Sequence, residues 1–161
     1  MAVKVGDKVP DVEIHTMGDA GPKKVSTAEV LGSGKVVLFA VPGAFTPGCS
    51  KTHLPGFVKD ADKLKAKGID TIACVSVNDA FVMQAWADAQ GVGDKIVMLA
   101  DGNGVFTEAM GLVMDGSGFG LGSRSRRYAA VLENGVFTSL DVEPKGGIDV
   151  SACSAVLDRL S

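Results

Sequence analysis

The sequence lacks the features of several large protein classes. Its three cysteines, an odd number in 161 residues, make a poor disulfide framework and are too few and too widely spaced for a standard zinc site. No apolar run approaches the roughly 18–20 residues that a membrane span needs. The net charge of −3 gives no general attraction to nucleic acid or to acidic membranes. The glycine-rich segment 116–122 lacks the G-x-G-x-x-G spacing of a nucleotide site, and no Walker-type loop is present.

The N-terminal residues also lack targeting features. Residues 1–7 show neither the apolar core of a signal peptide nor the Arg/Ser-rich character of a transit peptide. We therefore expect a cytoplasmic protein, unless a targeting segment was removed beforehand. The length fits one domain over residues 1–161, and it suffices for a hydrophobic core that needs no disulfide or metal ion to stabilise it.

Apolar, β-branched segments alternate with segments of helical spacing along the chain. Strands are expected over 35–41, 69–77 and 96–100, and helices over 54–67, 80–90 and 105–110. Asn134-Gly135 lies between two later strand-like runs and is a strong hairpin signal, and a last helix is expected after residue 149. The order predicts an α/β, thioredoxin-like fold: a mixed central β-sheet flanked by α-helices, with a C-terminal hairpin and helix.

Other local expectations are less regular. A short edge strand is expected over 12–15, a turn-rich connection over 18–24 and a glycine-rich loop over 114–123. Asn78 is expected to cap the helix over 80–90, whose core-facing residues would be Phe81, Ala85 and Trp86.

Cys49 lies where a predicted strand ends and a helix begins. A helix N-terminus favours an anion, so a thiol there loses its proton more readily, and the thiolate is the nucleophile. Thr46-Pro47-Gly48-Cys49 occupies the place of a C-x-x-C redox motif but has threonine as its first member. This points to chemistry with one attacking sulfur. The alternative is that Cys49 is an inert buried residue.

The residues alone leave the partners of Cys49 open. His53 would share a helix face with Cys49 and would suit a Cys/His thiol hydrolase or transferase. A packed or capping histidine near the pocket is the favoured interpretation, because a helix N-terminus already favours the thiolate and no base is required. Three arginines, Arg124, Arg126 and Arg127, are candidate donors to a negatively charged transition state. Strand alternation separates Arg127 from the other two but selects none of them.

Longer motifs resemble one family. The pattern Pro42-x-x-x-Thr46-x-x-Cys49 matches the peroxiredoxin signature, and the surrounding string PGAFTPGCS followed by HLPGF is similar to the type II, or peroxiredoxin-5-like, subfamily. Residues 74–86 and 120–128 agree as well, so the resemblance covers nearly the whole chain.

The resemblance implies a thiol peroxidase that reduces hydrogen peroxide and alkyl hydroperoxides. Cys49 would be the peroxidatic cysteine and would form a sulfenic acid. Thr46 would orient the peroxide, Pro42 would shield the pocket, and Arg127 would stabilise the thiolate.

Three more residues are expected to bind substrate, namely Gly48, Phe45 and His53. The resemblance also implies a homodimer packed near the active-site loops, with Phe45 and Phe119 as candidate contacts. A non-catalytic redox-sensing module with the same fold is the remaining alternative to the peroxidase and the hydrolase.

The other two cysteines bear on how the enzyme is regenerated. Cys74 lies in a buried strand and is a candidate resolving cysteine, although a core cysteine is the favoured interpretation. Cys153 is interpreted as structural. We therefore expect one catalytic cysteine, regenerated by glutathione and glutaredoxin or by thioredoxin, with no metal, haem or flavin cofactor.

Overall fold

A seven-stranded mixed sheet forms the centre of the molecule. The computed structural model describes residues 2–145 and 147–160, and the sheet has the strand order β2-β1-β5-β4-β3-β8-β9. A second, two-stranded sheet pairs β6 with β7. The elements are β1 (Glu13–Gly18), β2 (Gly21–Ser26), α1 (Thr27–Leu31), β3 (Lys35–Ala40), η1 (Cys49–His53), α2 (Leu54–Lys59), α3 (Ala61–Ala66), β4 (Thr71–Ser76), α4 (Ala80–Ala89), β5 (Val97–Ala100), α5 (Val105–Met110), β6 (Val113–Asp115), η2 (Ser117–Phe119), β7 (Ser123–Ser125), β8 (Tyr128–Glu133), β9 (Val136–Val142) and α6 (Cys153–Leu160).

The three parallel strands β3, β4 and β5 are the ones that the sequence predicted. The runs KVVLFA and TIACVS are apolar and rich in β-branched residues, as expected for strands covered on both faces. Phe39 of β3 lies opposite Cys74 of β4 in the parallel register. The fold is the expected thioredoxin-like arrangement, with helices on both sides of a mixed sheet.

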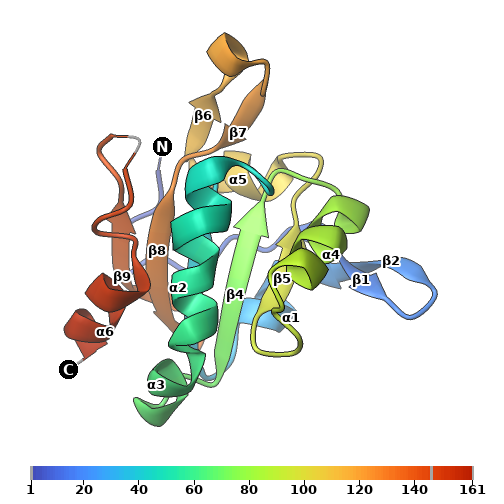
Figure 1. The fold of residues 1–161 in the computed structure, drawn as a ribbon. Coiled ribbons are helices and arrows are strands. Elements are labelled where there is room, and N and C mark those ends of the chain that lie inside the picture. Colours follow the sequence, from blue (N-terminus) through green and yellow to red (C-terminus); the bar gives the residue numbers. More distant parts are fainter. Residues whose placement is uncertain (1, 146, 161) are drawn as a thin grey trace.

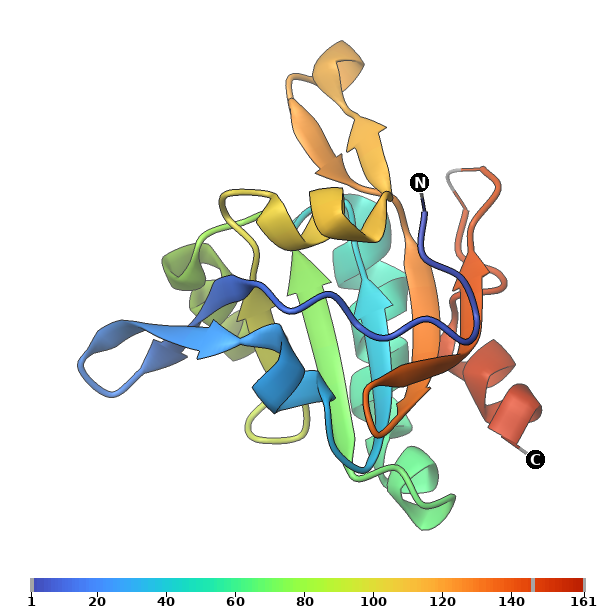
Figure 2. The same ribbon diagram turned by 180° about the vertical axis from the view of Figure 1, so that it is seen from behind.

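The two faces of the sheet are covered by different elements. Helices α2, α4 and α6 lie in front of the sheet in Figure 1, and their buried residues share one core with Cys49. Figure 2 shows the opposite face, which α1, α5 and the N-terminal segment cover. Phe106, Leu31 and Tyr128 are buried in the second core.

The hairpin of β8 and β9 turns at Asn134-Gly135, as predicted. Both residues have positive φ angles, 49° and 81°, which a tight hairpin turn requires. β8 runs antiparallel to β3, and Tyr128 lies opposite Ala40. Arg127 therefore lies at the edge of the sheet where β3 ends and the cysteine loop begins.

Two segments expected to be irregular form strands. Residues 21–26 make β2, which pairs with β1 along its whole length, so β1 is not an edge strand. Residues 113–125 hold β6, a 3₁₀ turn and β7, which Figure 1 shows as an arm extending beyond the main sheet. Backbone pairing stabilises both hairpins. The sequence did not predict them because glycine and charged residues have low strand propensity.

The phase of α4 also differs from the expectation. Asp79, rather than Asn78, caps the helix by accepting a hydrogen bond from the Val82 N–H at 2.8 Å. Of the three residues expected to face the core, Trp86 is buried, as predicted, whereas Phe81 and Ala85 are exposed. The residues that face the core are Ala80, Met83, Trp86 and Ala87.

Within residues 2–145 and 147–160, no helix has the length and apolar character needed to cross a membrane.

Candidate active site

The loop after β3 brings Cys49 into the first turns of a helix, as predicted. Thr46 closes the loop, since its Oγ1 donates to the Gly43 carbonyl at 2.7 Å. The Asn78 side chain accepts from the Ala44 N–H at 3.0 Å and ties the loop to the end of β4. The chain becomes helical at Pro47 and continues as the π-helical turn η1. These contacts fix the place of Cys49.

The thiol of Cys49 is buried and has a charged donor beside it. Its side chain is fully buried, and Arg127 Nη2 donates to its Sγ at 3.2 Å. Arg127 is itself only 9% exposed. A charge–dipole or charge–charge contact gains strength in such a dry setting. The geometry therefore supplies a donor that stabilises negative charge at this sulfur.

The structure separates the three candidate arginines. Arg124 donates from Nε to the Leu121 carbonyl at 2.9 Å and from Nη1 to the Pro42 carbonyl at 3.3 Å. Arg126 donates to the backbone carbonyl that follows β9. Arg127 is the one of the three whose side chain contacts Cys49.

His53 bonds to the arginine and not to the thiol. Its Nδ1 accepts from Arg127 Nη1 at 2.8 Å, so Nε2 carries the proton and donates to the Ser151 carbonyl at 2.9 Å. The pKa of His53 is lowered to about 4, mainly by burial and also by the Arg127 charge, against the opposing effects of the bond to Ser151 and of the Glu143 charge. A neutral histidine with these partners is not a base for Cys49. This geometry disfavours the Cys/His hydrolase.

Glu143 belongs to the same network, and the sequence analysis missed it. Its Oε2 accepts from the N–H groups of Asp149 and Ser151 and from Ser151 Oγ, at 2.7, 2.8 and 2.6 Å. Burial acts to raise the pKa of Glu143, but the bonds from Ser151 and Asp149 outweigh it and leave the pKa below its usual value. Its sequence signal was weak: one carboxylate at the end of a predicted strand, just before Pro144.

The other two thiols are buried and unpaired with each other. Cys74 lies within β4, and burial raises its pKa well above the ordinary value. Cys153 begins α6, and burial raises its pKa to about 12. At neutral pH both are thiols rather than thiolates, so neither is poised for attack.

Of the remaining predicted residues, Gly48 and Pro42 lie near Arg127, and Phe45 and Phe119 are exposed. A Cβ added to Gly48 would come within 3.4 Å of Arg127 Nη2, so Gly48 lies beside the arginine. Pro42 and Arg127 both line a hollow of about 210 Å³. Phe45 is 54% exposed, with a φ of 65° that is unusual for a residue other than glycine. Phe119, at 89%, is more exposed still.

The described residues hold no group of three or more His, Cys, Asp or Glu side chains that would bind a metal ion. A thioredoxin-like sheet that presents a buried thiol at a helix start, with a guanidinium at the sulfur, defines a thiol-based oxidoreductase.

Comparison with known proteins gives the family. The Redoxin family model matches residues 4–157. The chain is 49% identical to Peroxiredoxin-2E-2, chloroplastic, of Oryza sativa subsp. japonica, with 98% of this chain and 72% of that protein covered. It is 45% identical to Peroxiredoxin-2C of the same plant, with 98% of each chain covered. It also superimposes on the crystal structure of reduced Prx3 from Vibrio vulnificus in complex with H₂O₂, with a TM-score of 0.94, 49% identity and 99% of each chain covered.

The chain therefore belongs to the redoxin family and, within it, to the type II peroxiredoxins. It is a thiol peroxidase that works through a peroxidatic cysteine, which confirms the activity that the sequence predicted.

Proposed function

We propose that Cys49 is the peroxidatic cysteine and Arg127 its catalytic partner. The Cys49 thiolate attacks one oxygen of the hydroperoxide, the O–O bond breaks, and the products are the Cys49 sulfenic acid and hydroxide or alkoxide, which takes up a proton. Negative charge develops along the O–O axis during this step. A fixed donor at that position lowers the barrier. The 3.2 Å contact between Arg127 Nη2 and Cys49 Sγ is the observation that carries the proposal.

Thr46 and its neighbours would hold the peroxide. The Thr46 hydroxyl proton is committed to the Gly43 carbonyl, so its lone pairs are available to accept a bond from the peroxide hydroxyl. Pro42 and Gly48 would shape the pocket, and Phe45 would cover its mouth. His53 would act through Arg127 rather than touch the substrate.

The sulfenic acid is returned to thiol by an external reductant of the thioredoxin-like kind. We propose a one-cysteine route in which a first external thiol displaces water to form a mixed disulfide with Cys49, and a second thiol releases the Cys49 thiol and an external disulfide. The burial of Cys74 and Cys153 supports this route. Steady-state rates with the glutathione/glutaredoxin couple and with thioredoxin, compared at equal concentration, would identify the reductant. An internal disulfide in the oxidised protein would contradict the one-cysteine route.

We also propose a homodimer built on exposed phenylalanines. Phe45 and Phe119 were expected at the interface, and the structure adds Phe81, which is 65% exposed. Aromatic side chains are enriched at the interfaces between protein subunits. Sedimentation should give a dimer for the wild type and a monomer for Phe119→Glu; a monomeric wild type would overturn this proposal.

A cytoplasmic location remains a prediction, because the relatives include a chloroplastic protein and one whose name gives no compartment. Fractionation of source cells with an antibody to the protein would test it.

The direct test of the proposed site is single-turnover kinetics. Fully reduced protein is mixed with hydrogen peroxide without reductant, and the single tryptophan, Trp86, reports the reaction because its Nε1 donates to Ser50 Oγ beside Cys49. Cys49→Ser should abolish the rapid phase, whereas the matched variants Cys74→Ser and Cys153→Ser should retain it. A rapid phase that survives in Cys49→Ser would refute the assignment.

A further inference from the structure

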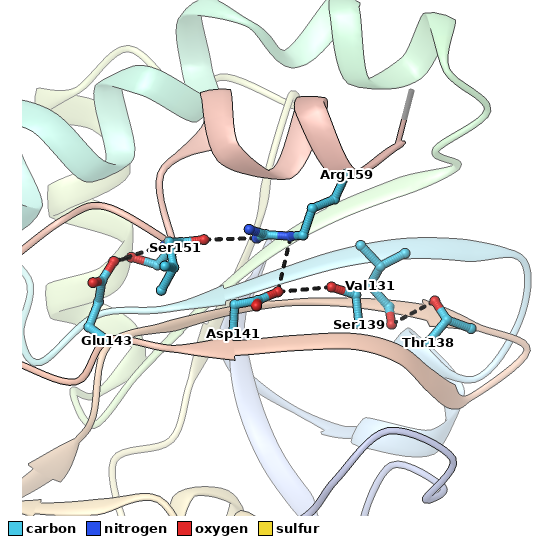
Figure 3. A network of polar contacts seen from close by, with 8 residues as sticks. Val131, Thr138, Ser139, Asp141, Glu143, Ser151 and Arg159 are labelled. Atoms are coloured by element: carbon cyan, nitrogen blue, oxygen red, sulfur yellow. Dashed lines mark hydrogen bonds and ion pairs between the residues drawn. The ribbon is translucent and has the colours of Figure 1, made fainter.

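The segment that follows β9 is held by two acidic residues at the end of that strand. Glu143 Oε2 binds the backbone of this segment at Asp149 and Ser151, and Ser151 adds its hydroxyl. Figure 3 shows Glu143 and Ser151 facing one another. One carboxylate oxygen thus holds two residues of this segment, Asp149 and Ser151.

A second contact secures the same segment from the side of α6. Arg159 Nη2 donates to the Val150 carbonyl at 2.8 Å, and its Nε lies 3.0 Å from Asp141 Oδ2. Ser139 Oγ donates to the same Asp141 oxygen at 3.0 Å, as Figure 3 shows. The Val150 carbonyl is therefore bonded to Arg159 on the α6 side. The carbonyl of the next residue, Ser151, is the one that bonds to His53 in the active site.

That next carbonyl sets the tautomer of His53. Because the Ser151 carbonyl can only accept, it requires the proton on His53 Nε2. The Nδ1 atom must then be the acceptor that Arg127 Nη1 needs. The guanidinium is a rigid planar fork, so holding Nη1 also directs Nη2 toward Cys49.

We propose that Glu143 is a positioning residue for Arg127, acting through the Ser151 carbonyl and the His53 ring. This inference rests on the proposed roles of Cys49 and Arg127. The Glu143 carboxylate bonds to Asp149 and Ser151 and not to the Cys49 sulfur. Its carboxylate orders the segment whose carbonyl holds His53 in the one tautomer that can accept from Arg127.

The groups that face His53 make this arrangement sensitive. Arg127 and Glu143 are ionisable groups that act on the ring, and Phe39 and Phe57 pack against it with ring centroids 5.1 and 5.6 Å away. A doubly protonated ring would have no acceptor for Arg127 and would repel its charge. Loss of the Ser151 carbonyl would also free the ring to take the other tautomer, which has no acceptor at Nδ1.

A double-mutant cycle tests the proposal. The variants are Glu143→Ala, His53→Ala and the two combined, and the readout is the rate constant of Cys49 oxidation by hydrogen peroxide in single turnover. We expect Glu143→Ala to lower this constant about tenfold in the wild-type background and less than about twofold in the His53→Ala background. Glu143→Gln, which keeps an oxygen acceptor, should restore much of the rate. Glu133→Gln, an exposed carboxylate of β8, is the matched control and should leave the rate unchanged.

The outcomes separate the possibilities. Equal factors in both backgrounds, or no effect in either, would overturn the role of Glu143. If Glu143→Ala does not fold, as judged by circular dichroism, the cycle is run with Ser151→Ala, which removes one of the three bonds to Glu143 and keeps the Ser151 carbonyl. Its effect on the rate constant must then be lost in the His53→Ala background. Failure of the proposed function has another signature: rapid oxidation would persist in Cys49→Ser, whatever residue stands at position 143.

Discussion

Two buried carboxylates, Asp101 and Glu143, accept nearly the same set of hydrogen bonds but stabilise different parts of the molecule. Asp101 follows β5 and accepts from the Phe106 and Thr107 N–H groups and the Thr107 hydroxyl at 3.0, 2.8 and 2.7 Å. Glu143 follows β9 and accepts from two N–H groups and one serine hydroxyl. Each satisfies the backbone of the segment that comes next.

The difference lies in what the ordered segment touches. The bonds to Asp101 start α5, which packs in the core on the face of the sheet away from Cys49. The bonds to Glu143 order residues 149–151, whose last carbonyl accepts from His53. The same local chemistry thus supports the fold in one place and the reactive centre in the other. Substitution of Asp101 should therefore lower the free energy of unfolding, whereas substitution in the Glu143 network should lower the rate of Cys49 oxidation.

The largest expected effect is at the catalytic end of the Glu143 network. Arg127→Gln removes the charged donor at Cys49 and should lower the rate constant of peroxide reduction about 10²–10³-fold. Arg127→Lys keeps the charge but cannot donate to His53 and Cys49 in the same fixed fork. Its rate constant should therefore lie between those of Arg127→Gln and the wild type. Stopped-flow oxidation measures both. Wild-type rates in Arg127→Gln would remove the arginine from the mechanism.

The next effect is a pH-dependent loss of stability caused by His53. The folded-state pKa of about 4 lies below the ordinary 6.5, so below pH 6.5 the unfolded chain binds a proton that the folded protein refuses. Stability is full above pH 6.5 and falls by about 3 kcal/mol as the pH drops to about 4. Urea denaturation of wild type and His53→Gln across this range isolates the effect, since His15 and Glu143 are common to both. Parallel pH curves for the two proteins would contradict it.

The third effect sharpens the contrast between the carboxylates. Asp101→Ala leaves the Phe106 and Thr107 N–H groups buried without their acceptor and should lower the free energy of unfolding by about 2 kcal/mol. The rate of Cys49 oxidation should stay within about twofold of wild type, because the Asp101 carboxylate bonds to Phe106 and Thr107, on the face of the sheet away from Cys49. The exposed Asp94→Ala is the matched control for stability. A tenfold loss of the Cys49 oxidation rate in Asp101→Ala would contradict the claim that Asp101 supports the fold alone.

The sequence predicted the fold and the reactive thiol because both rest on local patterns. Buried parallel strands, the Asn134-Gly135 turn and the strand-to-helix place of Cys49 all have strong signals within a few residues. The cap of α4 was predicted wrongly because Asn78 accepts from the Ala44 N–H instead, and Asp79 caps the helix.

The partners of the thiol were harder to predict because they join distant segments. Strand alternation separated Arg127 from its neighbours, but its contact with Cys49 spans 78 residues. The link from His53 to Ser151 spans 98 residues and uses a backbone carbonyl, which leaves no trace in side-chain identity. Glu143 acts through the backbone of Ser151, so its link to His53 could not be predicted from residue types and spacing and was found in the structure.

The most direct test of the account is the identity of the first oxidised cysteine. Reduced protein is treated with one equivalent of hydrogen peroxide in the presence of a sulfenic acid trap, and the adduct is located by peptide mass analysis. The account predicts one adduct, on Cys49, with no internal disulfide. An adduct on Cys74 or Cys153, with Cys49 unmodified, would contradict it.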